Sequence, residues 1–170
     1  MLNELELTGR ASTHVVQRDD LRAALHRDVL EPFLALKAAA ASSGIDLQIA
    51  SGFRDFGAQL RIWNMKYRGE RPLYDAAGNV RDHASLNPGE LIEGILCWSA
   101  LPGASRHHWG TDLDVIDRAA MPDGFSRTHR PARGVRGQKR RSACQGGIIK
   151  ISRISKAGLV PAFLLLQPSV

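Results

Sequence analysis

Acidic residues are missing from the last quarter of this 170-residue chain. The last glutamate is Glu93 and the last aspartate is Asp123, so residues 126–170 contain ten Lys or Arg and no acidic residue. The other 13 basic residues and all 17 acidic ones lie in residues 1–125, which therefore carry a net charge of −4 against +6 for the whole chain. We predict one incomplete domain in residues 1–125 and a basic tail in residues 126–170 that is foreign to its fold.

The chain also has few cysteines and no long apolar run. Cys97 and Cys144 form no disulfide framework, and the longest late apolar run, Ala157–Leu166, is too short to span a bilayer and contains Pro161. Met1–Arg10 alternates leucine with polar residues and does not resemble a secretory leader. These absences predict a soluble protein that has no membrane segment and works in the cytoplasm.

Hydrophobic periodicity predicts a mixture of helices and strands. The expected helices are residues 19–43, 56–67 and 88–98, and the expected strands are residues 45–50 and 111–116, with 146–151 as a further strand in the tail. Pro32 interrupts the first helix, so the chain is either kinked there or begins its helix nearer Asp28. Residues 69–86 are expected to be irregular.

Residues 105–114 combine two imidazoles and two carboxylates around one glycine, in the pattern Ser-x-His-x-x-Gly-x-x-x-Asp. Histidine nitrogen and carboxylate oxygen are typical zinc ligands, and a catalytic zinc uses three protein ligands and leaves one position open. His107 can fold back over the glycine to meet a carboxylate on the strand that follows. Asp112 and Asp114 share one face of that strand, so the spacing does not decide between them. We interpret His108 as a histidine satisfied by hydrogen bonds.

A second polar cluster, residues 51–59, follows the first predicted strand. Arg54 lies where that strand joins the next helix, and a guanidinium at such a junction can reach an open face. It could bind a carboxylate in fork geometry or stabilise an oxyanion. The alternative is a surface ion pair with Asp55 or Asp46, which would carry no function.

Together, the Ser51-Gly52-Phe53-Arg54 stretch with Gln59 and the histidine–aspartate pattern of residues 105–114 resemble the zinc D-alanyl-D-alanine carboxypeptidase and dipeptidase family. That family shares a superfamily with lysostaphin-type peptidases and the hedgehog signalling domain. The resemblance covers about residues 26–125. It implies an α+β fold in which helices pack on a small antiparallel sheet that carries a zinc site, and hydrolysis of D-Ala-D-Ala bonds in peptidoglycan stem peptides.

The resemblance also implies a role for each matching residue. His107 and Asp114 would be two zinc ligands, and Arg54 would stabilise the developing oxyanion or the substrate carbonyl. Ser105 and Gln59 would help to hold the terminal carboxylate and the peptide groups of the substrate. The implied cofactor is therefore Zn²⁺, and the implied partner is a peptidoglycan-derived peptide. That substrate class would place the protein in the periplasm or cell envelope rather than in the cytoplasm.

The tail departs from the family pattern. The family places a glutamate, its general base, shortly before a histidine that is the third zinc ligand, as Glu-x-x-His or Glu-x-x-Trp-His. No glutamate follows Glu93, and His129 has no carboxylate at that offset. His129 and His83 are therefore the candidates for the third ligand, although His83 by itself is interpreted as a hydrogen-bonded histidine. We hypothesise that residues 126–170 are translated out of frame; sequencing the other frame past Gly124 for the Glu/His motif tests this.

Three functional hypotheses follow. The first is a zinc D,D-peptidase by descent, with weak zinc binding and little hydrolysis because a positioned base alone contributes about 10²–10⁴ in rate. The second is a binding protein that holds a peptide carboxylate through Arg54, Ser105 and Gln59 without cleaving it. The third is sequence-independent binding of nucleic acid by the tail, whose only Phe, Tyr or Trp is Phe163. The composition of the tail favours a solvated, unstructured segment over this third hypothesis.

Overall fold

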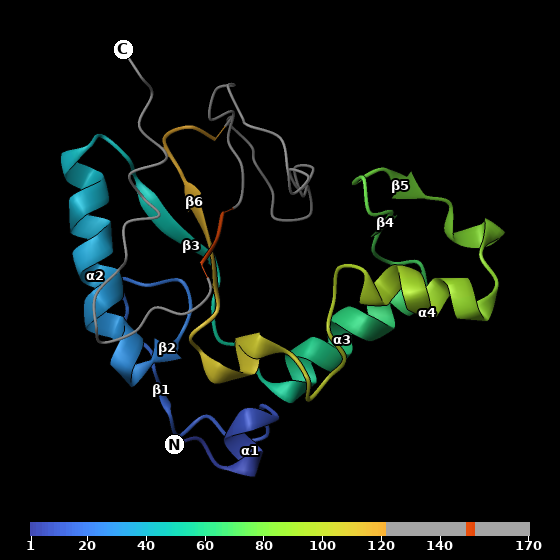
Figure 1. Cartoon of the computed structure of the whole chain (residues 1–170), viewed down its shortest axis with the longest axis horizontal. Helices are drawn as coiled ribbons and strands as arrows, with labels where there is room; N and C mark the ends of the chain where they lie inside the picture. Colours follow the sequence, from blue (N-terminus) through green and yellow to red (C-terminus); the bar gives the residue numbers. More distant parts are fainter. Residues whose placement is uncertain (122–148, 152–170) are drawn as a thin grey trace.

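The computed structural model describes residues 1–121 and 149–151 (Figure 1). The α-helices are α1 (Glu4–Leu7), α2 (Arg27–Ser42), α3 (Phe56–Tyr67) and α4 (Pro88–Leu96), and the 3-10 helices are η1 (His83–Ser85) and η2 (Arg106–Trp109). The strands are β1 (Val15–Val16), β2 (Leu25–His26), β3 (Leu47–Ser51), β4 (Leu73–Tyr74), β5 (Val80–Arg81), β6 (Leu113–Asp117) and β7 (Ile149–Ile151).

A small antiparallel sheet and one long helix form the main core. The sheet has the order β3-β6-β7, with β6 in the centre, and α2 lies beside β3 and β6 (Figure 1). Alternate residues of β3 and β6 meet the apolar side of α2 in this core. Its principal members are Val29, Phe33, Leu36 and Ala40 from α2, Leu47 and Ile49 from β3, and Leu113 and Val115 from β6. The arrangement confirms the predicted α+β class.

α2 begins later than the longer of the two predicted helices, which started at residue 19. Residues 19–26 are not helical, and the helix begins at Arg27, close to the alternative start near Asp28. Nδ1 of His26 caps this end by accepting the Asp28 N–H at 3.1 Å. Pro32 lies inside the helix. Proline has no backbone N–H, so one hydrogen bond of the helix is missing there. Gly44, with φ of 76°, follows the last turn, as the sequence indicated.

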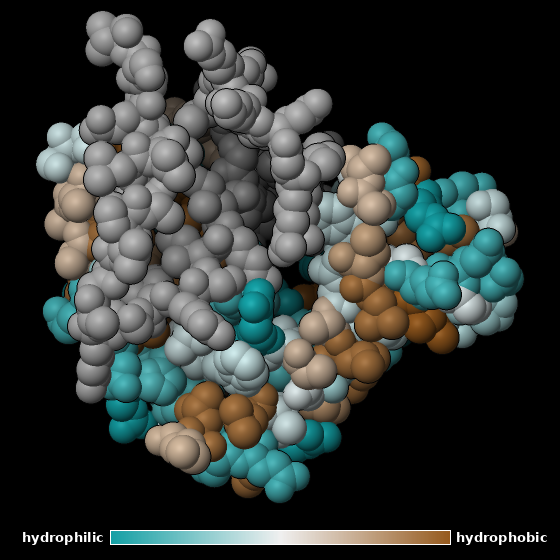
Figure 2. Space-filling model, in the orientation of Figure 1, coloured by the Kyte–Doolittle hydropathy of each residue, from teal (hydrophilic) through white to brown (hydrophobic). Residues whose placement is uncertain are grey.

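A second, smaller layer is built from α3, α4 and a hairpin that the sequence analysis missed. Residues 69–86 were expected to be irregular, but β4 and β5 pair antiparallel within them. Two-residue strands leave almost no alternation to detect, which explains the error. A core of Leu73, Leu91 and Ile95 joins the hairpin to α4. Apolar surface gathers over this part of the molecule in Figure 2, and its exposed residues include Leu60, Tyr67, Ile92, Leu96 and Leu101.

The basic tail contributes one described strand. Ile149–Ile151 pairs with β6, which confirms the predicted strand at these three residues. Since residues 122–148 and 152–170 lie outside the described part, the domain boundary at residue 125 and the foreign origin of the tail stay predictions. In the described ranges no helix is long and apolar enough to cross a membrane.

Candidate functional site

A β-bulge places Ser51 on the same face of the sheet as Asp114. The register pairs Ile49 with Val115 but Ser51 with Asp114, so Ala50 is one extra residue in β3. In a regular ladder Ala50 would lie opposite Asp114, and Ser51 would turn to the α2 face of the sheet. The bulge therefore brings the start of the Ser-Gly-Phe-Arg stretch to the carboxylate that the sequence analysis proposed as a ligand.

A backbone contact fixes which ring nitrogen of His107 carries the proton. His107 lies on η2, is almost fully buried, and donates its Nδ1–H to the Gly52 carbonyl at 3.0 Å. A carbonyl oxygen can only accept, so the proton is on Nδ1 and Nε2 is unprotonated in the neutral ring. Nε2 lies 3.6 Å from Oδ2 of Asp114. This tautomer, fixed by a backbone acceptor, is the one that metal-binding histidines commonly use.

The spacing of these two atoms fits two ligands of one zinc ion. A separation of 3.6 Å between His107 Nε2 and Asp114 Oδ2 is long for a hydrogen bond. Two ligands of a tetrahedral zinc, each bound at about 2.1 Å, lie about 3.4 Å apart. Within residues 1–121 and 149–151 no group of three or more His, Cys, Asp or Glu side chains converges on such a site. Among the described residues, His107 and Asp114 are thus the candidate ligand pair, and no third ligand-type side chain lies with them.

The structure separates the two aspartates that the sequence could not distinguish. Asp112 lies just before β6, and its Oδ2 is 3.2 Å from Nε of Arg106. Asp114 lies within β6 and faces His107 instead. The two carboxylates thus have different neighbours although they are only two residues apart.

Arg54 is held from two sides at the edge of this pair. Its Nη1 donates to Oε1 of Gln59 at 2.6 Å, and its Nη2 donates to Oγ of Ser51 at 2.9 Å. Its backbone N–H donates to the His107 carbonyl at 3.0 Å. The side chain of Arg54 thus bonds to the residue opposite Asp114, and its backbone bonds to His107.

Gln59 connects the arginine to the loop before η2. It is buried on α3, and its Nε2 donates to the Ala100 carbonyl at 2.6 Å. Trp63, one turn further along α3, donates to the same carbonyl. Both ends of the Gln59 amide therefore have protein partners, which makes Gln59 a residue that positions Arg54. Its direct contact with substrate stays a prediction, as does that of Ser105, which is buried at the N-cap of η2.

His108 is a hydrogen-bonded histidine, as predicted. Its Nδ1–H donates to the Arg54 carbonyl at 2.6 Å, and its Nε2 accepts the Gly103 N–H at 3.0 Å. Burial lowers the pKa of the His108 imidazole, so the neutral ring is favoured. His83 likewise binds a backbone carbonyl, that of Tyr67, at 2.8 Å. His129 lies outside the described residues.

Backbone groups also align the site, and the sequence did not reveal them. The Gly52 carbonyl fixes the His107 tautomer, and the Arg54 N–H ties the strand end to η2. A Cβ on Gly52 would lie 2.8 Å from Cβ of Ala23, so this position excludes larger residues. The glycine in the Ser-Gly-Phe-Arg stretch was the available signal for this close packing.

The site and fold together define a small α+β domain in which a histidine, an aspartate and an arginine gather at a bulged strand. A sequence profile of the D-alanyl-D-alanine carboxypeptidase family, VanY, matches residues 22–137. This chain belongs to that family. A protein of Haemophilus influenzae described as uncharacterized is 40% identical over 98 residues, which are 56% of this chain and 67% of that protein.

Solved structures are similar to this chain at low sequence identity. VanYB in complex with D-alanine-D-alanine matches with a TM-score of 0.50 and 19% identity, over 65% of this chain and 54% of that one. A vancomycin-resistance D,D-pentapeptidase, VanY from a VanB-type cassette in complex with Zn(II), matches with a TM-score of 0.49 and 19% identity, over 67% of this chain and 55% of that one. The chain thus spans about half the length of these solved proteins.

Proposed function

We propose that this chain binds Zn²⁺ through His107 and Asp114 and acts on peptidoglycan peptides that end in D-Ala-D-Ala. The observation that carries the proposal is the pair of donor atoms 3.6 Å apart, with the imidazole proton committed to Gly52. Membership of the D-alanyl-D-alanine carboxypeptidase family supports the reaction class. The complex of VanYB with D-alanine-D-alanine supports the ligand class.

The residues of the chain would prepare a substrate for hydrolysis. Zinc, when bound, supplies a Lewis acid that polarises the scissile carbonyl and activates water. Arg54 would donate hydrogen bonds to the carbonyl oxygen as negative charge develops there. Gln59 and Ser51 hold the guanidinium in place before the substrate arrives, so little reorganisation is needed during the reaction. Ser105 would contact the peptide at the N-terminus of η2.

Metal analysis of the full chain tests the ligand assignment. We expect the unaltered protein to bind zinc weakly, and at least a ten-fold further loss of affinity in His107→Ala and in Asp114→Ala. Asp112→Asn is the control, because it changes the same residue type outside the proposed ligand pair, and Arg106 rather than His107 lies beside Asp112. Equal zinc affinity in His107→Ala and the unaltered protein would refute the site.

Hydrolysis is tested separately from metal binding. Release of D-alanine from a pentapeptide ending in D-Ala-D-Ala is measured with and without EDTA, and with Arg54→Ala beside the unaltered chain. Zinc-dependent release that Arg54→Ala lowers by 10²-fold or more is expected if Arg54 stabilises the oxyanion. Release that persists in EDTA would contradict a zinc-dependent reaction.

A second candidate is a protein that binds the same peptide without cleaving it. The specific observation in its favour is that no glutamate follows Glu93 within the 170 residues, although the resemblance implies a general base in that part of the chain. Calorimetry with a D-Ala-D-Ala-ended peptide distinguishes the two candidates. Binding without any release of D-alanine supports the second, and release supports the first.

A further inference from the structure

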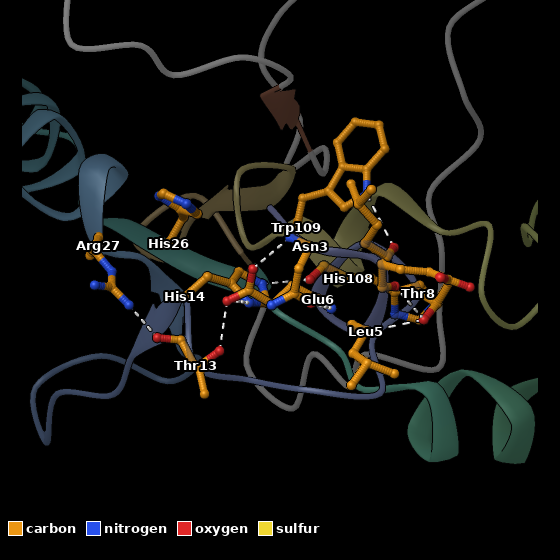
Figure 3. Close-up of polar contacts among 12 residues, drawn as sticks. Asn3, Leu5, Glu6, Thr8, Thr13, His14, His26, Arg27, His108 and Trp109 are labelled. Carbon is orange, nitrogen blue, oxygen red and sulfur yellow. Dashed lines mark hydrogen bonds and ion pairs between the residues drawn. The ribbon is translucent and has the colours of Figure 1, made fainter. Parts of the chain in front are cut away.

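Residues 3–14 form an arm that packs against η2, the element that carries His107. These residues precede the segment that matches the family profile, which begins at residue 22. The arm contacts η2 through α1, and the Trp109 indole N–H donates to the Leu7 carbonyl at 3.3 Å. Gly9 approaches so closely that a Cβ there would lie 2.3 Å from Nδ1 of His108. Figure 3 shows the polar contacts that this arm makes beneath η2.

A buried carboxylate lies at the centre of the arm. Oε2 of Glu6 accepts the Asn3 N–H at 2.9 Å, and the Asn3 side chain accepts the Glu6 N–H at 3.0 Å, which together form a capping box on α1. Oε1 of Glu6 accepts the Thr13 hydroxyl at 2.6 Å. Two groups of the arm therefore fix the carboxylate of a buried side chain (Figure 3).

His14 extends from this carboxylate to η2. Its Nε2–H donates to the His108 carbonyl at 2.8 Å, and its Nδ1 lies 3.7 Å from Oε1 of Glu6. The ring is only 3% exposed and packs edge to face on Phe53, with centroids 5.5 Å apart. A carboxylate, an imidazole and a backbone carbonyl thus form a chain of contacts from α1 to η2 (Figure 3).

His108 is consequently anchored at three atoms. Its carbonyl accepts from His14, its Nδ1–H donates to the Arg54 carbonyl, and its Nε2 accepts the Gly103 N–H. His107 is the preceding residue, and its backbone and ring direction depend on how η2 is held. The ring of His108 is held by Arg54 and Gly103, which lie in the family-matched region. The carbonyl of His108 is held by His14, which belongs to the arm.

We propose that Glu6 and His14 are positioning residues that hold η2 so that Nε2 of His107 faces Asp114. The inference rests on the proposed ligand role of His107. Groups that hold a metal ligand in place from outside the site typically contribute about 10–100-fold to metal affinity. Glu6 and His14 would act on His107 through the backbone of His108, the residue that follows it.

The test compares two variants of nearly equal size in the full metal-free chain. His14→Gln keeps an N–H that can reach the His108 carbonyl, whereas His14→Met fills the space without a donor. The readout is the ¹⁵N chemical shifts of the His107 ring, which report its tautomer. We expect a fixed Nδ1–H tautomer in the unaltered chain and in His14→Gln, and averaged shifts in His14→Met.

Leu73→Ala is the control for a general loss of stability, because Leu73 is buried in the separate core beside α4. It should destabilise the chain and leave the His107 shifts unchanged. If His14→Met leaves these shifts as in the unaltered chain, or if Leu73→Ala disturbs them equally, the proposal is overturned. Should His14→Met fail to fold, Glu6→Gln takes its place, and unchanged His107 shifts in Glu6→Gln overturn the proposal.

Zinc titration of the same proteins keeps this inference distinguishable from the proposed function. An unaltered chain that binds no zinc refutes the proposed metal site, whereas the metal-free shifts of His107 alone decide the role of His14. If the unaltered chain binds zinc, His14→Met should bind at least ten-fold more weakly and His14→Gln within about three-fold of the unaltered chain. Equal affinity in all three proteins would overturn the inference and leave the metal site intact.

Discussion

The packing of Gly9 against His108 makes a quantitative prediction about the arm. Gly9 has φ of 73°, and a Cβ added to it would lie 2.3 Å from Nδ1, 2.7 Å from Cγ and 2.9 Å from Cε1 of His108. The ring cannot turn aside, because both of its nitrogens are hydrogen-bonded and the residue is fully buried. Gly9→Ala must therefore displace the arm or η2.

Gly44 offers a matched control, because its φ of 76° is nearly the same and nothing lies within 4 Å of an added Cβ. Alanine in the left-handed region costs about 1–2 kcal/mol, partly offset by about 0.4–1 kcal/mol from the less flexible unfolded chain. Gly44→Ala should thus lower the free energy of unfolding by about 1 kcal/mol. Gly9→Ala adds an overpacking cost of about 1–3 kcal/mol, for a total of about 2–4 kcal/mol.

Urea denaturation of the full chain, followed by far-UV circular dichroism, measures both values from the midpoint and slope. The informative quantity is the difference between the two variants, since the backbone cost cancels. A difference within about 0.5 kcal/mol of zero would mean that the arm does not pack on His108, and the reasoning about the arm would be wrong.

Three further predictions concern the core, the arm and the arginine. Leu113→Ala, in a fully buried position of β6, should lower the free energy of unfolding by about 2–5 kcal/mol in the same urea assay, whereas the exposed Leu5→Ala should change it by less than about 0.5 kcal/mol. Hydrogen bonds from Thr13 and Asn3 lower the pKa of Glu6 below its ordinary value of 4.5, so its stabilising contribution is present above that pH and is lost as the pH falls. The difference in Tm between the unaltered chain and Glu6→Gln should accordingly shrink on acidification below pH 4.5, and a constant difference would contradict this. Gln59→Leu removes a buried acceptor and a buried donor at nearly constant volume; we expect a loss of about 1–3 kcal/mol in urea denaturation.

Local signals were sufficient for the longer elements. The capping pattern of Asn87, Pro88 and Glu90 located the start of α4, and α3 spans the residues predicted for it. The short hairpins β1–β2 and β4–β5 were not predicted, because two residues cannot establish a period. The early start predicted for α2 failed because Leu25 packs in the core from a strand.

The site was predictable as a set of residue types but not as a geometry. Spacing put Asp112 and Asp114 on one face, and only the position of Arg106 beside Asp112 separates them. The pairing of Gln59 with Arg54 crosses from α3 to the preceding loop, which no sequence period reveals. The packing of the arm on η2 was not predictable for the same reason, since the His14 side chain and the Leu7 carbonyl bond to His108 and Trp109, which lie far along the chain.

The extra residue in β3 has a consequence for how this sequence can vary. Deleting Ala50 would let Ser51 follow Ile49 directly and pair with Asp114 in a regular ladder, so Ser51 would stay on the same face of the sheet as Asp114. With Ala50 present, only the bulge keeps Ser51 on that face. In an alignment of relatives that use the same arginine, we therefore expect some chains with a gap opposite Ala50, and a small apolar residue where the position is filled, because Ala50 is buried with Ile116 and Met121.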